Sequence, residues 1–183
     1  SPIDGATSDN YTLTQADVGA EITVVVSYTD GEGTAESVTS DATSAVTNVN
    51  DEPTLDALSD ININEDDPEQ TVNLTGITAN GGEVQQLSVT AVSDNTSLIP
   101  DPTVTYSSAD STGTLKFTPV ADQFGTATIT VTVEDGGLDN NLATPGDNGV
   151  INRTVVVNVA PINDEPTLDA LSDININEDD PEQ

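Results

Sequence analysis

The sequence predicts an all-β protein whose antiparallel sheets pack as sandwiches. The first observation is a period of two, in which apolar residues alternate with Thr or Ser, a pattern typical of half-buried strands rich in β-branched side chains. Four segments show this pattern: residues 21–28, 87–92, 126–133 and 154–159. The second observation is that Asp-Gly and Asn-Gly-Gly turn signals lie between them. No segment keeps a helical period, so we expect sheets that cover one another.

The third observation is an internal repeat. The stretch NDEPTLDALSDININEDDPEQ occurs at residues 50–70 and again, letter for letter, at residues 163–183. One complete unit therefore covers residues 50–163, and such a length is normal for a β-sandwich. We expect residues 164–183 to be the opening strands of a next module of identical type. Modules in tandem arrays contact only their neighbours, so the joints between them decide the overall shape.

A weaker similarity joins the beginning of the chain to the complete unit. Residues 11–29 (YTLTQADVGAEITVVVSYT) and residues 116–134 (KFTPVADQFGTATITVTVE) both contain a strand, an Ala-Asp turn and a long alternating strand, and Asp-Gly follows each. Residues 1–49 are therefore expected to be the C-terminal half of a related sandwich that lacks its first strands. A half-sandwich exposes unpaired edges and its core face. We expect preceding chain or strands from a neighbour to complete it.

Composition excludes several classes of function. Asp and Glu total 33 against 2 for Lys and Arg, a formal net charge of −31, which excludes a nucleic-acid binder and argues against docking on anionic lipid. His and Cys are absent, which excludes Ser-His-Asp catalysis, thiolate zinc sites and disulfides. No apolar run approaches the roughly 18 residues of a membrane span, and we expect no signal peptide at the start of the chain. Without Trp, and with few Tyr and Phe to stack a sugar, we expect no glycosidase. Because the sequence offers no set of catalytic groups, we expect no other enzyme.

Topology alone predicts that acidic residues gather at one end of the complete unit. In an immunoglobulin-like sandwich the first strand, near residues 61–64, and the last strand both descend to that end, where the turn before strand 126–133 also lies. The acids expected there are Glu65, Asp66, Asp122 and Asp164. Two carboxylates about 4 Å apart repel by roughly 4 kcal/mol at an effective dielectric of 20. Ca²⁺ relieves such repulsion because it takes 6–8 oxygen ligands in flexible geometry, whereas Mg²⁺ is stricter and softer metals prefer His or Cys.

Three motifs resemble those of a known family. Residues 113–137 (GTLKFTPVADQFGTATITVTVEDGG) resemble the cadherin pattern of strand, Pro-Leu-Asp-Arg-Glu, strand and Asp-x-Gly. Residues 63–68 (INEDDP) resemble the Pro-Glu-Asn stretch of the first cadherin strand, and Asn-Asp-Glu-Pro at 50–53 and 163–166 resembles the cadherin linker. These forms are similar to cadherin-like and immunoglobulin-like extender repeats of large bacterial surface adhesins of the RTX type. The resemblance implies tandem Ig-like/cadherin-like antiparallel β-sandwich modules in an elongated array, secreted or on a bacterial cell surface.

The resemblance also implies Ca²⁺ at the joints, with ligands at the positions that match the family's motifs. The ligands implied at the downstream joint are Glu65, Asp122, Asn163 and Asp164. Those implied at the upstream joint are Asp135, Asn50 and Asp51, with Asp30 as the counterpart of Asp135 in the half-sandwich. Gln123-Phe124 replaces the family's Arg-Glu, and the linker is one residue shorter. We therefore expect one or two ions at each joint instead of the family's three.

The main hypothesis is a non-enzymatic extracellular spacer, stiffened by Ca²⁺, whose partners are neighbouring modules of the same chain. A second is a module that binds polysaccharide or a like module through an exposed aromatic platform. Tyr106 and residues 138–150 are the only candidates for such a platform, and both are poor. A third is a filament subunit in which residues 54–70 or 167–183 pair with a neighbour's incomplete sandwich. Against a metal at any site stands the alternative that these acids are solvated turn residues, and for Asp17 the pattern favours a turn-capping role over that of a ligand.

Overall fold

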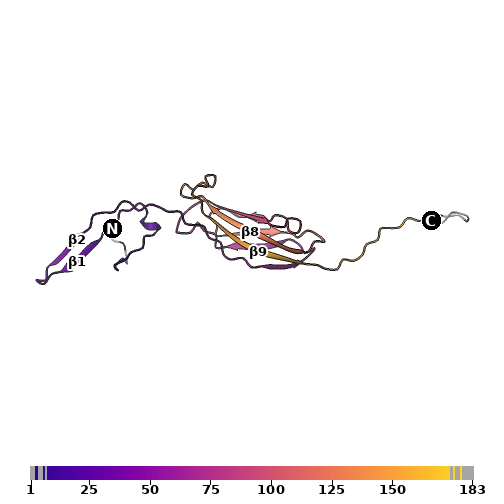
Figure 1. Cartoon of the computed structure of the whole chain (residues 1–183), viewed down its shortest axis with the longest axis horizontal. Coiled ribbons are helices and arrows are strands. Elements are labelled where there is room, and N and C mark those ends of the chain that lie inside the picture. The colour runs from indigo at the N-terminus through magenta and orange to yellow at the C-terminus, as the bar shows by residue number, and fades with distance from the viewer. Residues whose placement is uncertain (1–2, 4–5, 7, 174, 176–177, 179–183) are drawn as a thin grey trace.

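The structure, a computed structural model, describes residues 3, 6, 8–173, 175 and 178. Within them the chain forms a hairpin, a two-layered sandwich and an extended segment that leads toward the C-terminus, one after another along the long axis (Figure 1). A short 3-10 helix, η1 (Gln15–Asp17), precedes the hairpin. No helix in the described part is long and apolar enough to cross a membrane.

The sandwich consists of a four-stranded and a three-stranded sheet, which confirms the predicted all-β class. The larger sheet has the order β3 (Ile61–Asn64), β9 (Val150–Ala160), β8 (Gly125–Asp135), β5 (Leu87–Ser93). The smaller sheet has the order β4 (Gln70–Thr75), β7 (Thr112–Phe117), β6 (Thr103–Thr105). All pairs are antiparallel except β3 with β9, where Ile61 lies opposite Val157. That parallel pair brings the ends of β3 and β9 to the same end of the sandwich.

The core follows directly from the alternation along β8 and β9. The inward-facing residues of these strands are buried: Ala127, Ile129, Val131, Val133, Val155, Val157 and Val159. Leu74, Leu115 and Phe117 cover them from the smaller sheet. Both strands have 11 residues and pair along nearly their whole length, about 36 Å at 3.3 Å per residue. These two strands therefore run the length of the sandwich. We call the end toward the hairpin the upstream end and the opposite end the downstream end.

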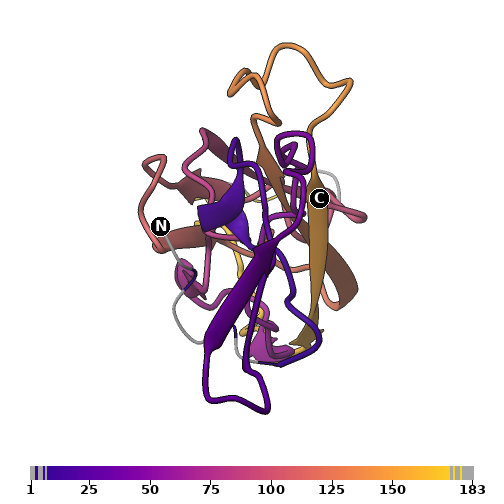
Figure 2. The same cartoon turned by 90° about the vertical axis from the view of Figure 1, so that its left-hand side faces the viewer.

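The hairpin of β1 (Val25–Thr29) and β2 (Ala35–Thr39) differs from the half-buried strand predicted for residues 21–28. All ten of its strand residues are exposed on both faces, because no second sheet covers the hairpin within the described residues. Figure 2, in which the hairpin end faces the viewer, shows the hairpin in front of the sandwich and the loop between β8 and β9 projecting from one side.

The described part of the second repeat copy takes a different conformation from the first. Residues 164–173 form no strand, and Leu168 is 84% exposed whereas its identical counterpart Leu55 is 2% exposed in the core. The predicted opening strand of a next module falls at residues 174–177, of which only Asn175 lies among the described residues.

Candidate metal centres at the ends of the sandwich

Three carboxylates converge at the downstream end. Asp66 follows β3, Asp122 lies in the turn before β8, and Asp164 follows β9. One oxygen from each of these carboxylates lies within 4.8 Å of the others, and all three residues are exposed. We call this set the downstream cluster. The parallel pairing of β3 with β9 is the reason that residues almost one hundred positions apart in the sequence meet here.

Two members of the downstream cluster lie in left-handed backbone. Asp66 has φ of 66° and Asp122 has φ of 57°, a region that Asp tolerates better than most residues with a side chain. The Asp122 N–H donates to Asp66 Oδ1 at 3.3 Å, and the Asn64 N–H donates to Asp67 Oδ2 at 2.8 Å to close the turn after β3. The turn after β3 is therefore closed by the carboxylate of Asp67, and the carboxylate of Asp66 connects this turn to the turn before β8.

Glu65 does not belong to this set of three, although the resemblance implied it as a ligand. Its side chain is buried, and Oε1 accepts the N–H of Ile162 at 2.8 Å. Glu65 thus anchors the segment that carries Asp164 to the end of β3. Asn163 is exposed and donates to the Asp164 carbonyl at 3.2 Å. Asp66, which topology grouped with Asp122 and Asp164, occupies the position that the resemblance implied for Glu65.

At the upstream end, Asp135 is a fully buried carboxylate at the end of β8. Its Oδ1 accepts the N–H groups of Gly137 at 2.9 Å and Gly149 at 2.8 Å, which ties together both ends of the loop between β8 and β9. Asn50 Nδ2 lies 3.2 and 3.3 Å from the two carboxylate oxygens. Buried charge requires such partners, and here they are all neutral donors.

Two residues that the sequence interpretation missed join the linker to the sandwich. Glu83 accepts Asn48 Nδ2 at 2.9 Å on Oε1 and the Asp51 N–H at 3.2 Å on Oε2. Gln85 Nε2 donates to Asn50 Oδ1 at 2.7 Å and to Glu83 Oε2 at 2.9 Å. The upstream network therefore consists of Asn48, Asn50, Asp51, Glu83, Gln85 and Asp135. A signal was present: Glu-x-Gln directly after Asn-Gly-Gly places two polar side chains on the same side of an extended segment.

The remaining predicted ligands serve local roles. Asp51 joins the upstream network through its backbone, while its carboxylate packs on Gly81, where an added Cβ would lie 1.9 Å from Oδ2. Asp30 Oδ1 accepts the N–H groups of Glu32 at 2.9 Å and Thr34 at 2.8 Å, so it caps the hairpin turn. Within the described residues Asp30 makes no hydrogen bond to another predicted ligand. Asp17 is buried and accepts the Thr14 N–H at 2.8 Å, the capping role that the pattern favoured.

Among the described residues, neither cationic side chain pairs with these acids. Lys116 Nζ pairs with Glu69 at 2.7 Å on the exposed side of the smaller sheet, and Arg153 Nε donates to the Leu55 carbonyl at 3.0 Å. A pair of carboxylates about 4 Å apart repels by about 1 kcal/mol in bulk water and about 4 kcal/mol at a surface dielectric of 20. A divalent cation that prefers oxygen ligands would remove this repulsion in the downstream cluster.

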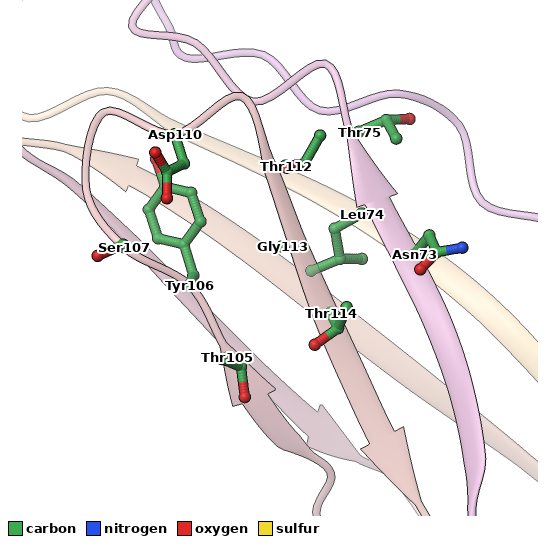
Figure 3. A pocket seen from close by; sticks show the side chains of 10 residues that line it. All are labelled: Asn73, Leu74, Thr75, Thr105, Tyr106, Ser107, Asp110, Thr112, Gly113 and Thr114. Atoms are coloured by element: carbon green, nitrogen blue, oxygen red, sulfur yellow. The ribbon is translucent and has the colours of Figure 1, made fainter.

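A shallow groove of about 540 Å³ lies over β4, β7 and the end of β6, beside the one aromatic residue considered for sugar binding. The Tyr106 ring extends toward Asp110 next to Gly113 (Figure 3). An added Cβ on Gly113 would lie 3.3 Å from the ring, so the ring packs closely on its own sheet. Burial, followed by the charge of Asp110, raises the pKa of the Tyr106 hydroxyl. Tyr106 is thus half-buried packing and not a free stacking platform.

No family model matches the chain, and no curated protein matches it. Solved structures of the S-layer protein SbsC are similar. Its domains 4 and 5 give a TM-score of 0.39 at 20% identity over 77% of this chain and 59% of that one. Domains 4–9 give 0.40 at 19% identity over 79% of this chain and 19% of that one. This chain therefore spans less than two thirds of the SbsC chains that it matches.

Proposed function

We propose that the protein is a non-enzymatic structural module of an extracellular surface protein, a spacer whose ends bind Ca²⁺. The observation that carries this proposal is the downstream cluster, in which three carboxylates from three separate segments lie within 4.8 Å of one another. One of them, Asp164, belongs to the linker that leads into the second repeat copy. The absence of His and Cys from the sequence and the close packing of Tyr106 also favour a structural role over catalysis or sugar stacking.

A cation in the downstream cluster would connect the linker to the body of the sandwich. Asp66 and Asp122 project from the sandwich, and Asp164 follows the last strand, so shared coordination would hold the exit direction of the chain. Removal of the cation leaves three carboxylates without a local positive charge, and their repulsion favours a linker that swings away. The exposed, flexible oxygen set suits Ca²⁺ better than Mg²⁺, with an affinity typical of extracellular modules, about 10⁻⁴–10⁻³ M.

At the upstream joint the proposed ligands are Asn50, Asp51, Asp135 and the additional carboxylate of Glu83. Asn50 and Glu83 already lie within hydrogen-bond distance of the same Gln85 amide nitrogen. Rotation of the Gln85 amide would present its buried Oε1, which has no hydrogen-bond partner among the described residues, to a cation. The hydrogen bonds that the Gln85 amide nitrogen donates to Asn50 and Glu83 would then be replaced by coordination of one shared ion.

Calorimetry of the full chain with Ca²⁺, Mg²⁺ or EDTA tests the proposal. A ligand that binds only the folded state at one hundred times its dissociation constant adds about 2.7 kcal/mol for each independent site. We expect a clear rise in melting temperature with Ca²⁺ and little with Mg²⁺. Asp122→Asn removes one charge from the downstream cluster and should reduce the rise, whereas Asp110→Asn, an exposed acid beside the Tyr106 groove, should preserve it. Equal melting in all three buffers would contradict a metal role and leave the acids as solvated turns.

A further inference from the structure

The hairpin presents to solvent the face that forms the core in the complete sandwich. Val24, Val26 and Tyr28 lie 105 residues before Ile129, Val131 and Val133, and the Asp-Gly that follows them is offset equally. The three later residues are 0% exposed, whereas Val24, Val26 and Tyr28 are 60%, 54% and 55% exposed. Contiguous apolar surface of this kind marks an interaction site. We call it the valine face.

The second repeat copy carries the sequence that occupies the equivalent place in the complete sandwich. There, the first copy contributes Leu55 to the core and pairs β3 in parallel with the outer edge of β9. β2 pairs with β1 as β9 pairs with β8, so the outer edge of β2 corresponds to the place of β3. Within the described residues no strand pairs with that edge. In the second copy, Leu168 and Leu171 are 84% and 83% exposed.

We propose that the valine face binds residues 163–183 of a second copy of this chain. The donated segment adds a parallel strand along β2 and places Leu168 and Leu171 against the valine face, as the identical first copy does on its own sandwich. The hairpin becomes a three-stranded sheet with one covered face, which an isolated hairpin needs for stability in water. The contact is head-to-tail, so it propagates into linear chains of copies. This inference goes beyond the spacer function and needs no metal.

If residues 163–183 are the donor, their length requires that they come from another copy. The hairpin and the described beginning of the second repeat copy, residues 163–173, lie at opposite ends of the sandwich (Figure 1), separated by the length of β9, about 36 Å. To reach the hairpin of its own copy, the repeated segment would have to run back along the sandwich, which needs about 11 of its 21 residues in extended form. Too few would remain to reproduce the leucines and the strand together. The net charge of −31 on each copy opposes association, so salt should strengthen the contact through screening.

Sedimentation velocity of the full chain at high ionic strength tests the proposal. We expect reversible, concentration-dependent oligomers, weakened at least about tenfold by Val26→Asp on the acceptor and by Leu168→Asp with Leu171→Asp on the donor. Val92→Asp, at a valine of similar exposure on β5, is the matched control and should associate like the parent chain. Equal behaviour of all variants would overturn the proposal. Association of the Leu168/Leu171 variant at parental strength would show that valine faces pair with each other, and would overturn it as well.

Mixing and cross-linking give a second, independent result. A mixture of the acceptor-defective and donor-defective chains retains one competent contact, so it should form dimers and nothing larger. In the complete sandwich, Asn158 on β9 lies opposite Asn62. Thr43 lies 115 residues before Asn158, and Asn175 is the repeat copy of Asn62. In the proposed contact Thr43 of one copy should therefore lie opposite Asn175 of the other. A short bismaleimide should therefore join a Thr43→Cys chain to an Asn175→Cys chain, because the parent has no Cys. Glu36→Cys, at the turn end of β2, should not react with Asn175→Cys, and equal yields from both positions would contradict the placement.

Discussion

The buried carboxylate of Asp135 leaves no space for a side chain at Gly149 in the loop between β8 and β9. An added Cβ on Gly149 would lie 2.6 Å from Asp135 Oδ2 and 3.0 Å from Pro53 Cδ, in a site with no room to relax. We expect Gly149→Ala to lower the free energy of unfolding by about 1–3 kcal/mol, as overpacked cores do. Gly146→Ala is the control in the same loop, because an added Cβ there meets nothing within 4 Å. Urea unfolding of the full chain would show the difference, and equal midpoints would contradict this packing.

The turn at η1 predicts a linked titration of two residues. The N–H of Thr14, followed by the hydroxyl of Tyr11, lowers the pKa of Asp17, and the bond to Asp17 raises the pKa of Tyr11. A lowered carboxyl pKa means that the Asp17 contribution is present above its unfolded value, about 3.9, and is lost as pH falls through the folded value. A raised Tyr pKa means that the contribution of Tyr11 is present below about 10 and is lost as pH rises through the folded value.

Asp17→Asn tests this coupling. We expect the Tyr11 ring to titrate above pH 10 in the parent chain and to return toward pH 10 in the variant, as followed by its NMR ring signals. Tyr28, whose pKa is raised by its hydrogen bond to Glu36, is the internal reference and should titrate identically in both chains. An unchanged Tyr11 titration would show that the hydrogen bond of 2.9 Å between Tyr11 and Asp17 does not hold in solution.

At the scale of elements, two strands of similar sequence have opposite surroundings. Ile129 on β8 is fully buried, and its counterpart Val24 beside β1 is exposed. We expect Ile129→Ala to cost about 2–5 kcal/mol of stability and Val24→Ala to change it by less than about 0.5 kcal/mol. Both variants should be compared by calorimetry at low protein concentration, where the hairpin stays unpaired. Comparable losses would mean that the hairpin face is covered in the monomer.

The alternation of apolar residues was enough to predict the all-β class, β5, β8 and β9, because a period of two reports burial directly. The topology of an immunoglobulin-like sandwich also predicted that acids would gather at the downstream end. It could not choose between Glu65 and Asp66, since the left-handed backbone of Asp66 decides which side chain faces outward. The sequence did not predict Glu83 and Gln85 as members of the upstream network, because their role arises from contact with a linker more than 30 residues away. The exposure of both hairpin faces was also not predicted, because the alternation along a strand does not show whether an opposing sheet is present.

At the scale of the whole molecule, we expect stiffness to depend on the joints, because β8 and β9 pair along nearly their whole length inside the sandwich. Glu83 accepts bonds from Asn48, Asp51 and Gln85, so Glu83→Ala removes the centre of the upstream network. We expect small-angle scattering at low protein concentration to give a narrow distance distribution for the parent chain with Ca²⁺. The distribution should broaden with a chelator as repulsion returns, and broaden in Glu83→Ala with or without Ca²⁺. Asp110→Asn should scatter like the parent. A distance distribution that is unchanged by both the chelator and Glu83→Ala would mean that neither an ion nor these hydrogen bonds set the stiffness of the joint, and would contradict the proposed stiffening.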